Sequence, residues 1–283
     1  MVSCFACFDS RSSRNDRSEN QDSPDQDEEM HTAVERNSYT SFVTCDDKFD
    51  SMVVLNDAML PDILQKGFEN MALLREMMVS KQGFIPNGTV EDTNLWYIGR
   101  SATGLPPIAL GEIRISGLPS LTPTMVGEYI LDLENKPKWD TELQLAEVIV
   151  RSPVNCLDDP STVTAGYFKT WAGMKPKPGI SGRDFVYNGI SRSHESEFCA
   201  VSWSVEDIDC PIQYRPGVRS PNHTRGKIIL AGFLVRKNEN NEVLINYLTQ
   251  VETGISGWMV DPVVKKSPKL LNGLKKYINE RTM

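Results

Sequence analysis

The stretch KPKPGISGRDFVYNGISR, residues 175–192, says more about the fold than any other part of the sequence. Two Lys-Pro pairs and two glycines, which resist regular secondary structure, lead directly into an Arg-Asp pair. Residues then alternate along a strand, with Phe185, Tyr187 and Gly189 on one face. The stretch therefore predicts a stiff, basic loop that runs into a strand with large aromatic side chains near its start.

Similar alternation recurs along most of the chain. Strand-like segments bounded by turn residues are expected at 95–99, 108–116, 143–151, 162–171, 183–193, 197–206, 226–237 and 242–252. Helical periodicity predicts helices over 60–78, from Thr122-Pro123 to Lys136-Pro137, and from Asp261 to Ile278 with a kink at Pro268. Because strands and helices are segregated, we expect an α+β fold with an antiparallel sheet. Such a sheet curls, and a terminal helix across its concave side would close a cavity.

Charge divides the chain into two parts. Residues 1–50 hold 12 acidic and 5 basic residues, a net charge of −7, whereas the remainder holds 26 and 25, a net charge of −1. We interpret 1–50 as a disordered acidic leader and 57–281 as the folded domain. A nearly neutral domain lacks the basic footprint of a nucleic-acid-binding protein, so no nucleic-acid partner is expected.

The sequence shows no recognisable catalytic or metal-binding motif. Its three histidines lie in the leader or at predicted turns, and Cys4-x-x-Cys7 has no second ligand pair at zinc-site spacing. The longest apolar run, 228–235, is too short to cross a bilayer, and the start of the chain does not resemble a secretory signal. We therefore expect a cytoplasmic protein with reduced thiols, no cofactor, no metal and no catalytic residues.

Cys4 and Cys7 lie among aromatic residues at the end of the acidic leader. Two nearby thiols on a flexible arm suit paired S-acylation, since two acyl chains anchor a protein stably where one does not. One hypothesis is thus a carrier held peripherally on a membrane by its leader. The alternative is a pair of incidental thiols.

Five segments together resemble the START family of lipid-transfer domains, in the family's order and spacing. They are YILDLENKPKWD (129–140), SGRDFVYNGISR (181–192), RGKIILAGFLV (225–235), YLTQVETG (247–254) and PVVKKSPKLLNGLKKYI (262–278). The resemblance implies a START helix-grip, in which a curved antiparallel β-sheet wraps around a long C-terminal helix and encloses a lipid cavity. GISGW at 254–258 departs from the family's usual Gly-Gly-x-Pro turn.

The resemblance also implies candidate lipid contacts. Phosphatidylcholine-binding members enclose choline with three aromatic rings and meet the phosphate with a basic residue. By position these would be Tyr167, Phe185 and Phe233 with Lys136, which suits cation–π attraction to a quaternary ammonium. Lysine here replaces an arginine, and phenyl rings replace more electron-rich groups. Ordinary core packing is the alternative role for these rings.

Neighbours on the same strands extend the predicted lipid-binding set. Trp171 shares a strand face with Tyr167, and Tyr187 shares one with Phe185. A sterol or ceramide would instead need a few buried polar groups, for which the candidates are Asn188, Arg192, Asn246 and Gln250.

Basic residues are expected beside the opening of the cavity. In the family the loop that corresponds to 172–182 lies over the tunnel mouth next to the last helix. The predicted membrane-facing residues are Lys175, Lys177, Lys265, Lys266 and Lys269.

The sequence thus predicts a monomeric, non-enzymatic carrier of one lipid, with a phospholipid such as phosphatidylcholine favoured, that makes transient contact with membranes. The alternatives are a sterol or ceramide carrier, a lipid sensor, and an enzyme on the helix-grip scaffold.

Overall fold

The structure is a computed structural model that describes residues 60–101, 104–154, 164–176, 181–204, 223–254, 264–265 and 267–282. Only the backbone is described at 60–61, 149–154, 164–169 and 171. The leader predicted for 1–50, with Cys4 and Cys7, lies outside the described residues.

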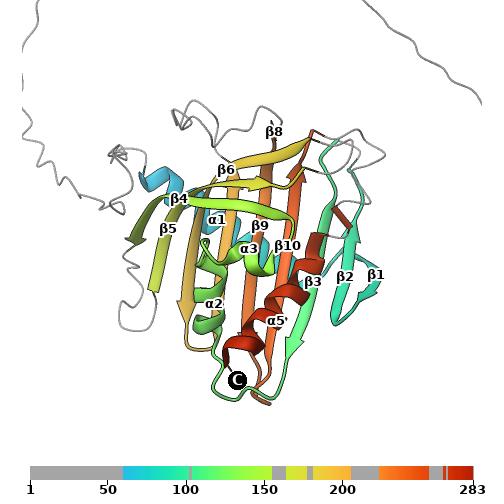
Figure 1. Cartoon of the computed structure of the whole chain (residues 1–283), viewed down its shortest axis with the longest axis vertical. Helices are drawn as coiled ribbons and strands as arrows, with labels where there is room; N and C mark the ends of the chain where they lie inside the picture. Colours follow the sequence, from blue (N-terminus) through green and yellow to red (C-terminus); the bar gives the residue numbers. More distant parts are fainter. Residues whose placement is uncertain are drawn as a thin grey trace, which may run out of the picture. The chain divides into compact units, whose positions relative to one another are not determined.

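Within the described residues, ten strands form one sheet in the order β1-β2-β3-β10-β9-β7-β6-β5-β4. The strands are β1 Ile85–Val90, β2 Thr93–Ile98, β3 Ile108–Ile115, β4 Leu143–Val154, β5 Thr164–Met174, β6 Gly182–His194, β7 Glu197–Ser204, β8 His223–Arg225, β9 Lys227–Lys237 and β10 Val243–Glu252. Neighbours along this order are antiparallel, and β8 pairs with β6 in parallel. The sheet is curved but open, with β1 and β4 at its two edges (Figure 1).

Helices cover both faces of this sheet. On one face α1 (Leu60–Ser80) packs its buried Leu74 and Met78 in a core cluster with Val186 and Leu234. On the other face lie α2 (Pro123–Leu131), α3 (Lys136–Trp139), the 3-10 turn η2 (Ser267–Lys269) and α5 (Leu270–Thr282). Figure 1 shows α5 crossing the face opposite α1. Central strands such as β9 are consequently buried on both sides.

The helix α2 begins as the sequence predicts. The Thr122 hydroxyl accepts a hydrogen bond from the Met125 amide at 3.2 Å, and Pro123 occupies the first turn. The predicted end at Lys136-Pro137 is wrong. The helix ends at Leu131, because Asp132 binds the backbone and side chain of Asn135 at 3.2 and 2.6 Å and so forms a turn. Lys136 and Pro137 then start the short helix α3.

The helix α5 buries one face against the sheet. Leu271, Leu274 and Ile278 are 0% exposed and Tyr277 is 6% exposed, as the periodicity predicts. Pro268 lies in the 3-10 turn η2 directly before α5, while the predicted start at Asp261 falls outside the described residues. The predicted α+β helix-grip fold, a curved antiparallel sheet around a C-terminal helix, is confirmed. No helix in the described part of the chain is long and apolar enough to span a bilayer.

Candidate functional site: a cavity between the sheet and the last helix

A cavity of about 260 Å³ lies between the sheet and the layer formed by α2, α3 and the start of α5. Most of its wall is apolar: Ile130, Leu133, Leu143, Ala172, Phe185, Ile228, Ala231, Phe233, Val251, Val264 and Leu270. Its exposed lining residues, Lys175 and Ser181, mark the opening to solvent. We call this end of the cavity the mouth.

Strand alternation selects which side chains reach the cavity. On β6 the lining residues are Arg183, Phe185 and Tyr187, and the intervening positions face α1. On β10 they are Tyr247, Thr249 and Val251, and Thr253 just after the strand continues the row. The concave face of the sheet is thus the floor of the cavity.

Three aromatic rings form a cluster at the inner wall. Phe233 and Tyr247 are register partners on β9 and β10, so their side chains share a face, and their ring centroids are 4.6 Å apart. Trp139 at the end of α3 meets Phe233 edge-on with centroids 6.4 Å apart.

Lys136 places a positive charge beside these rings. Its Nζ atom lies 5.4 Å from the Trp139 ring centroid and 6.0 Å from that of Phe233. Lys136 lines the cavity, and burial lowers the pKa of its ammonium, an effect that the charge of Asp140 opposes. Lys136 is half-buried, and it lines the cavity beside Phe233.

Asp140 follows one helical turn after Lys136 and also lines the cavity. Burial raises the pKa of its carboxyl, while Lys136 and the Glu142 amide, which donates to Oδ1 at 3.3 Å, lower it. Burial likewise raises the pKa of Tyr187, and that of Tyr247 to about 12, so both phenols stay neutral at physiological pH. These four residues thus add a cation, an acid and two hydroxyls to the mostly apolar wall of the cavity.

The Arg183-Asp184 pair separates at the start of β6. The Arg183 guanidinium lines the cavity and donates to the carbonyl oxygens of Thr253 and, at 2.6 Å, of Ser181. Burial lowers the pKa of Arg183. Asp184 points to the opposite face, where its carboxylate is 1% exposed and binds Arg225 of β8 at 2.9 Å. Each residue of the pair therefore fixes the start of the strand through a partner of its own.

The structure brings four of the predicted lipid contacts together in the cavity wall: Lys136, Phe185, Tyr187 and Phe233. Tyr167 and Trp171 belong to β5, but their side chains lie outside the description. Arg192 occupies an even-numbered position of β6, on the side that faces away from the cavity.

The polar residues considered for a sterol or ceramide share that other face. Asn246 donates to the Glu112 carboxylate at 3.0 Å, and Gln250 donates to the Pro106 carbonyl at 3.0 Å. Neither lines the cavity. The sterol and ceramide hypothesis expected Asn246 and Gln250 to contact the ligand, and this expectation is wrong. Because side chains alternate along β10, both residues face α1 and not the cavity.

Three residues at the site were missed from the sequence: Trp139, Asp140 and Tyr247. Tyr247 was detectable, since a hairpin turn at 237–242 sets Tyr247 opposite Phe233. Trp139 and Asp140 depend on the short helix α3, for which the sequence gives little periodicity.

The described basic residues predicted to face a membrane make local contacts. Lys175 donates from Nζ to the Thr141 carbonyl at 2.8 Å, and Lys269 lies 3.8 Å from the Glu142 carboxylate. Lys265 lies 4.3 Å above the Tyr97 ring. Lys177 and Lys266 are outside the described residues. Across the part of the chain that the structure describes, no group of three His, Cys, Asp or Glu residues is placed to hold a metal ion.

A curved open sheet that holds a C-terminal helix over an apolar cavity defines the helix-grip class of ligand-binding domains. The START domain model matches residues 102–275, more than half of the sequence, and the chain belongs to the START family.

Solved structures share this fold. Human StAR-related lipid transfer protein 5 is 15% identical with a TM-score of 0.59, covering 79% of this chain and 99% of that chain. Human STARD10 is 16% identical with a TM-score of 0.52, covering 74% and 78%. At such identities the likeness shows the fold alone.

A curated relative is the Homeobox-leucine zipper protein HOX32 of Oryza sativa subsp. indica. It is 26% identical over 163 residues, which are 56% of this chain and 17% of the relative. The match thus spans about a sixth of that protein.

Proposed function

We propose that this chain binds one lipid in its cavity and transfers it between membranes without chemical conversion. The observation that carries the proposal is a mostly apolar cavity whose polar groups include a half-buried lysine and a buried aspartate beside aromatic rings. Ligand pockets typically combine such apolar walls with a few polar groups that orient the ligand. The name of human StAR-related lipid transfer protein 5 agrees with this proposal.

Phosphatidylcholine is the ligand class that the polar groups fit best. The Lys136 ammonium would bind the phosphate, while Phe233, Tyr247 and the Asp140 carboxylate would attract the quaternary ammonium. Phe185 lines the same cavity, as the family's choline-enclosing positions require. A zwitterionic headgroup would match the oppositely charged side chains of Lys136 and Asp140 beside the aromatic rings.

Cavity size adds a requirement to this proposal. About 260 Å³ is below the roughly 300–1,000 Å³ of typical ligand pockets. A two-chain phospholipid therefore requires the walls to separate, and loading involves a wider state than the one described.

Membrane contact is proposed for the mouth of the cavity. Lysines near an anionic surface contribute on the order of 1 kcal/mol each. The proposed membrane-facing residues are Lys175, Lys177, Lys265, Lys266 and Lys269. The carrier would act as a monomer in the cytoplasm, and S-acylation of Cys4 and Cys7 would tether its leader to one membrane. Unaltered membrane association of a Cys4→Ser/Cys7→Ser variant would eliminate the tether.

Native mass spectrometry of the full chain, after mixing with liposomes of varied lipids, tests the proposal. We expect one phosphatidylcholine retained per chain. If the chain retained a sterol or a ceramide instead, the proposed ligand class would be wrong, but the proposed lipid transfer would stand. A chain that is empty against phospholipids, sterols and ceramides alike would contradict the carrier itself and favour an enzyme on the same scaffold.

A further inference from the structure

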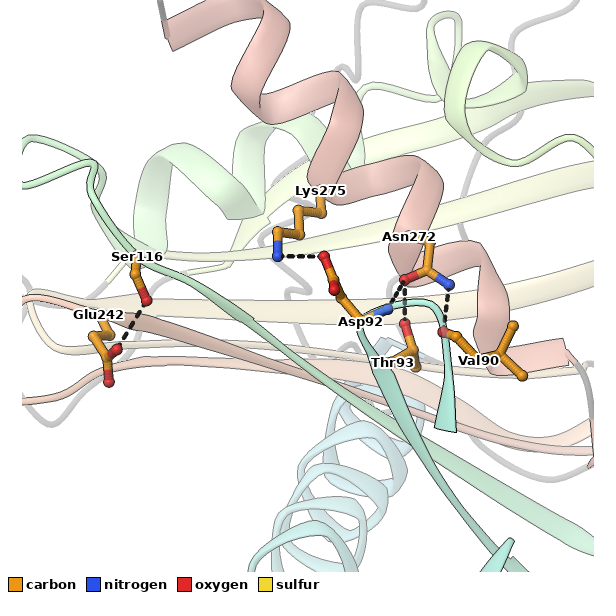
Figure 2. A network of polar contacts seen from close by, with 7 residues as sticks. All are labelled: Val90, Asp92, Thr93, Ser116, Glu242, Asn272 and Lys275. Atoms are coloured by element: carbon orange, nitrogen blue, oxygen red, sulfur yellow. Dashed lines mark hydrogen bonds and ion pairs between the residues drawn. The ribbon is translucent and has the colours of Figure 1, made fainter. Parts of the chain in front are cut away.

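A clasp of polar contacts joins α5 to the turn between β1 and β2 (Figure 2). The Asn272 amide donates to the Val90 carbonyl at 2.9 Å, and its oxygen accepts from the Thr93 hydroxyl at 2.8 Å and the Asp92 amide at 3.3 Å. One turn further along the helix, Lys275 binds the Asp92 carboxylate at 2.7 Å. Because one Asn side chain meets three groups of the turn, any displacement of this part of α5 breaks several bonds together.

Two glycines allow α5 and the residue before it to approach neighbouring elements closely. At Gly111 of β3 an added Cβ atom would collide with Pro268, the residue that leads into α5. At Gly273 of α5 it would collide with the carbonyl oxygen of Trp139 in α3. Close-packed contacts of this kind do not deform gradually. Together with its four fully or nearly buried side chains, they fix α5 to the sheet, to α3 and to the hairpin.

Across the mouth of the cavity, η2 meets the opposite wall through an exposed ion pair. The turn Thr141-Glu142 leads into β4, which lies at the edge of the sheet. This turn receives two hydrogen bonds from Lys175, one from Nζ to the Thr141 carbonyl at 2.8 Å and one from the amide to the Glu142 carbonyl at 2.9 Å. Across the cavity mouth the Glu142 carboxylate faces Lys269 at 3.8 Å, with both side chains about a third or more exposed. Exposed ion pairs contribute little, and salt screens them. We call these three contacts the latch.

We propose that α5 remains fixed while lipid enters and leaves, and that the cavity opens by release of the latch, with the turn Thr141-Glu142 and the first residues of β4 moving away from η2. The proposal rests on the proposed lipid-transfer function. In this proposal α5 is a stationary wall, and the turn Thr141-Glu142 is the moving one. The Glu142–Lys269 pair also lies at the membrane-facing end, where anionic headgroups would compete for the lysine.

Two reversible bridges test this assignment in the full chain. The native cysteines other than the buried Cys199 are replaced by serine, and the transfer rate of this untethered parent is the reference for both bridged variants. Asp92→Cys/Lys275→Cys then allows a bridge across the clasp, and Glu142→Cys/Lys269→Cys one across the latch. Each variant is closed with a short bis-methanethiosulfonate reagent and reopened with dithiothreitol, so that each protein is its own control.

The assay follows fluorescent phosphatidylcholine from donor to acceptor phosphatidylcholine vesicles. We expect the clasp bridge to change the transfer rate less than twofold and the latch bridge to lower it at least tenfold, with recovery on reduction. A tenfold loss with the clasp bridged, or no loss with the latch bridged, overturns the proposal.

A parent that transfers nothing would contradict the proposed function and leave the opening to a second measurement. Hydrogen exchange on addition of vesicles should then deprotect amides 141–145 while 271–280 stay protected. Loss of protection across 271–280 overturns the fixed helix.

Discussion

Lys136 gives the sharpest test of how the cavity recognises its ligand. Replacing it by methionine keeps the length of the side chain and removes the ammonium next to Trp139 and Phe233. If that ammonium binds the lipid phosphate, the variant loses a charge-assisted hydrogen bond of about 1.5–3 kcal/mol. At about 1.4 kcal/mol per factor of ten, phosphatidylcholine affinity should fall roughly 10- to 150-fold.

The matched control lies in the same helix. Lys138 is exposed and outside the cavity lining, so Lys138→Met should bind as the wild type does. Lys136→Arg should retain most of the affinity, because a guanidinium also binds phosphate. All variants must first show a wild-type thermal transition, since Lys136→Met leaves the buried Asp140 without its nearby cation.

The pH dependence provides an independent reading of the same interaction. Burial lowers the pKa of Lys136, so the cationic form in the empty cavity is lost at a pH below the ordinary value of 10.5. Wild-type affinity should weaken as the pH rises through that lowered pKa, and Lys136→Met should not show this change. Equilibrium binding of fluorescent phosphatidylcholine measures both effects. Wild-type affinity in Lys136→Met would refute the assignment of the phosphate to this residue.

Three further outcomes follow from the described contacts. Phe185→Ala with Phe233→Ala should lower phosphatidylcholine transfer while the protein stays folded by circular dichroism; unchanged transfer would eliminate the aromatic enclosure. Asn272→Ala removes the three Asn272 hydrogen bonds of the clasp and leaves the fully buried Thr93 hydroxyl unpaired, so unfolding should cost about 2 kcal/mol less, a fall in Tm of about 4–8 °C. An unchanged Tm would show that the clasp is not stabilising. Burial raises the pKa of the Cys199 thiol to about 12. Between pH 9 and 12 the folded state therefore binds more protons than the unfolded state, and stability should fall by about 1.4 kcal/mol per pH unit. Cys199→Ala should lack this contribution in urea titrations at pH 8 and 10, and an equal fall in both proteins would contradict it.

The strands that form the cavity were accessible from the sequence because they are long and alternate regularly. The alternation of β6 places Phe185 and Tyr187 on one face, and both line the cavity. The sequence of one strand could not show which of its two faces lines the cavity, since both faces of the central strands are apolar. Arg192 and Asn246 were considered as ligand contacts for this reason, although they lie on the α1 side.

Short elements were not accessible in the same way. The strand β1 contains Pro86, Asn87 and Gly88, residues typical of turns, and pairs with β2 through a register shift. The strand β8 has only three residues, which is too few for any periodicity. The helix α3 contains a proline and four residues in all, so Asp140 remained hidden even though Lys136 was identified by resemblance.

Burial of β9 on both faces affects how its register with the neighbouring strands is determined. A strand with one solvent-facing side is held in register because a slip by one residue would expose its apolar side chains. On β9 such a slip would exchange Phe233 and Leu234, both of which are buried. Gly232 removes this ambiguity: a Cβ atom there would collide with the Ala200 carbonyl and press on Leu74 of α1. A one-residue slip would bring Ala231 or Phe233 into that position. The absence of a side chain at Gly232 thus sets the register of β9 and, with it, the arrangement of the cavity floor. Inserting a single residue into β9 should therefore be less tolerated than most substitutions along the strand.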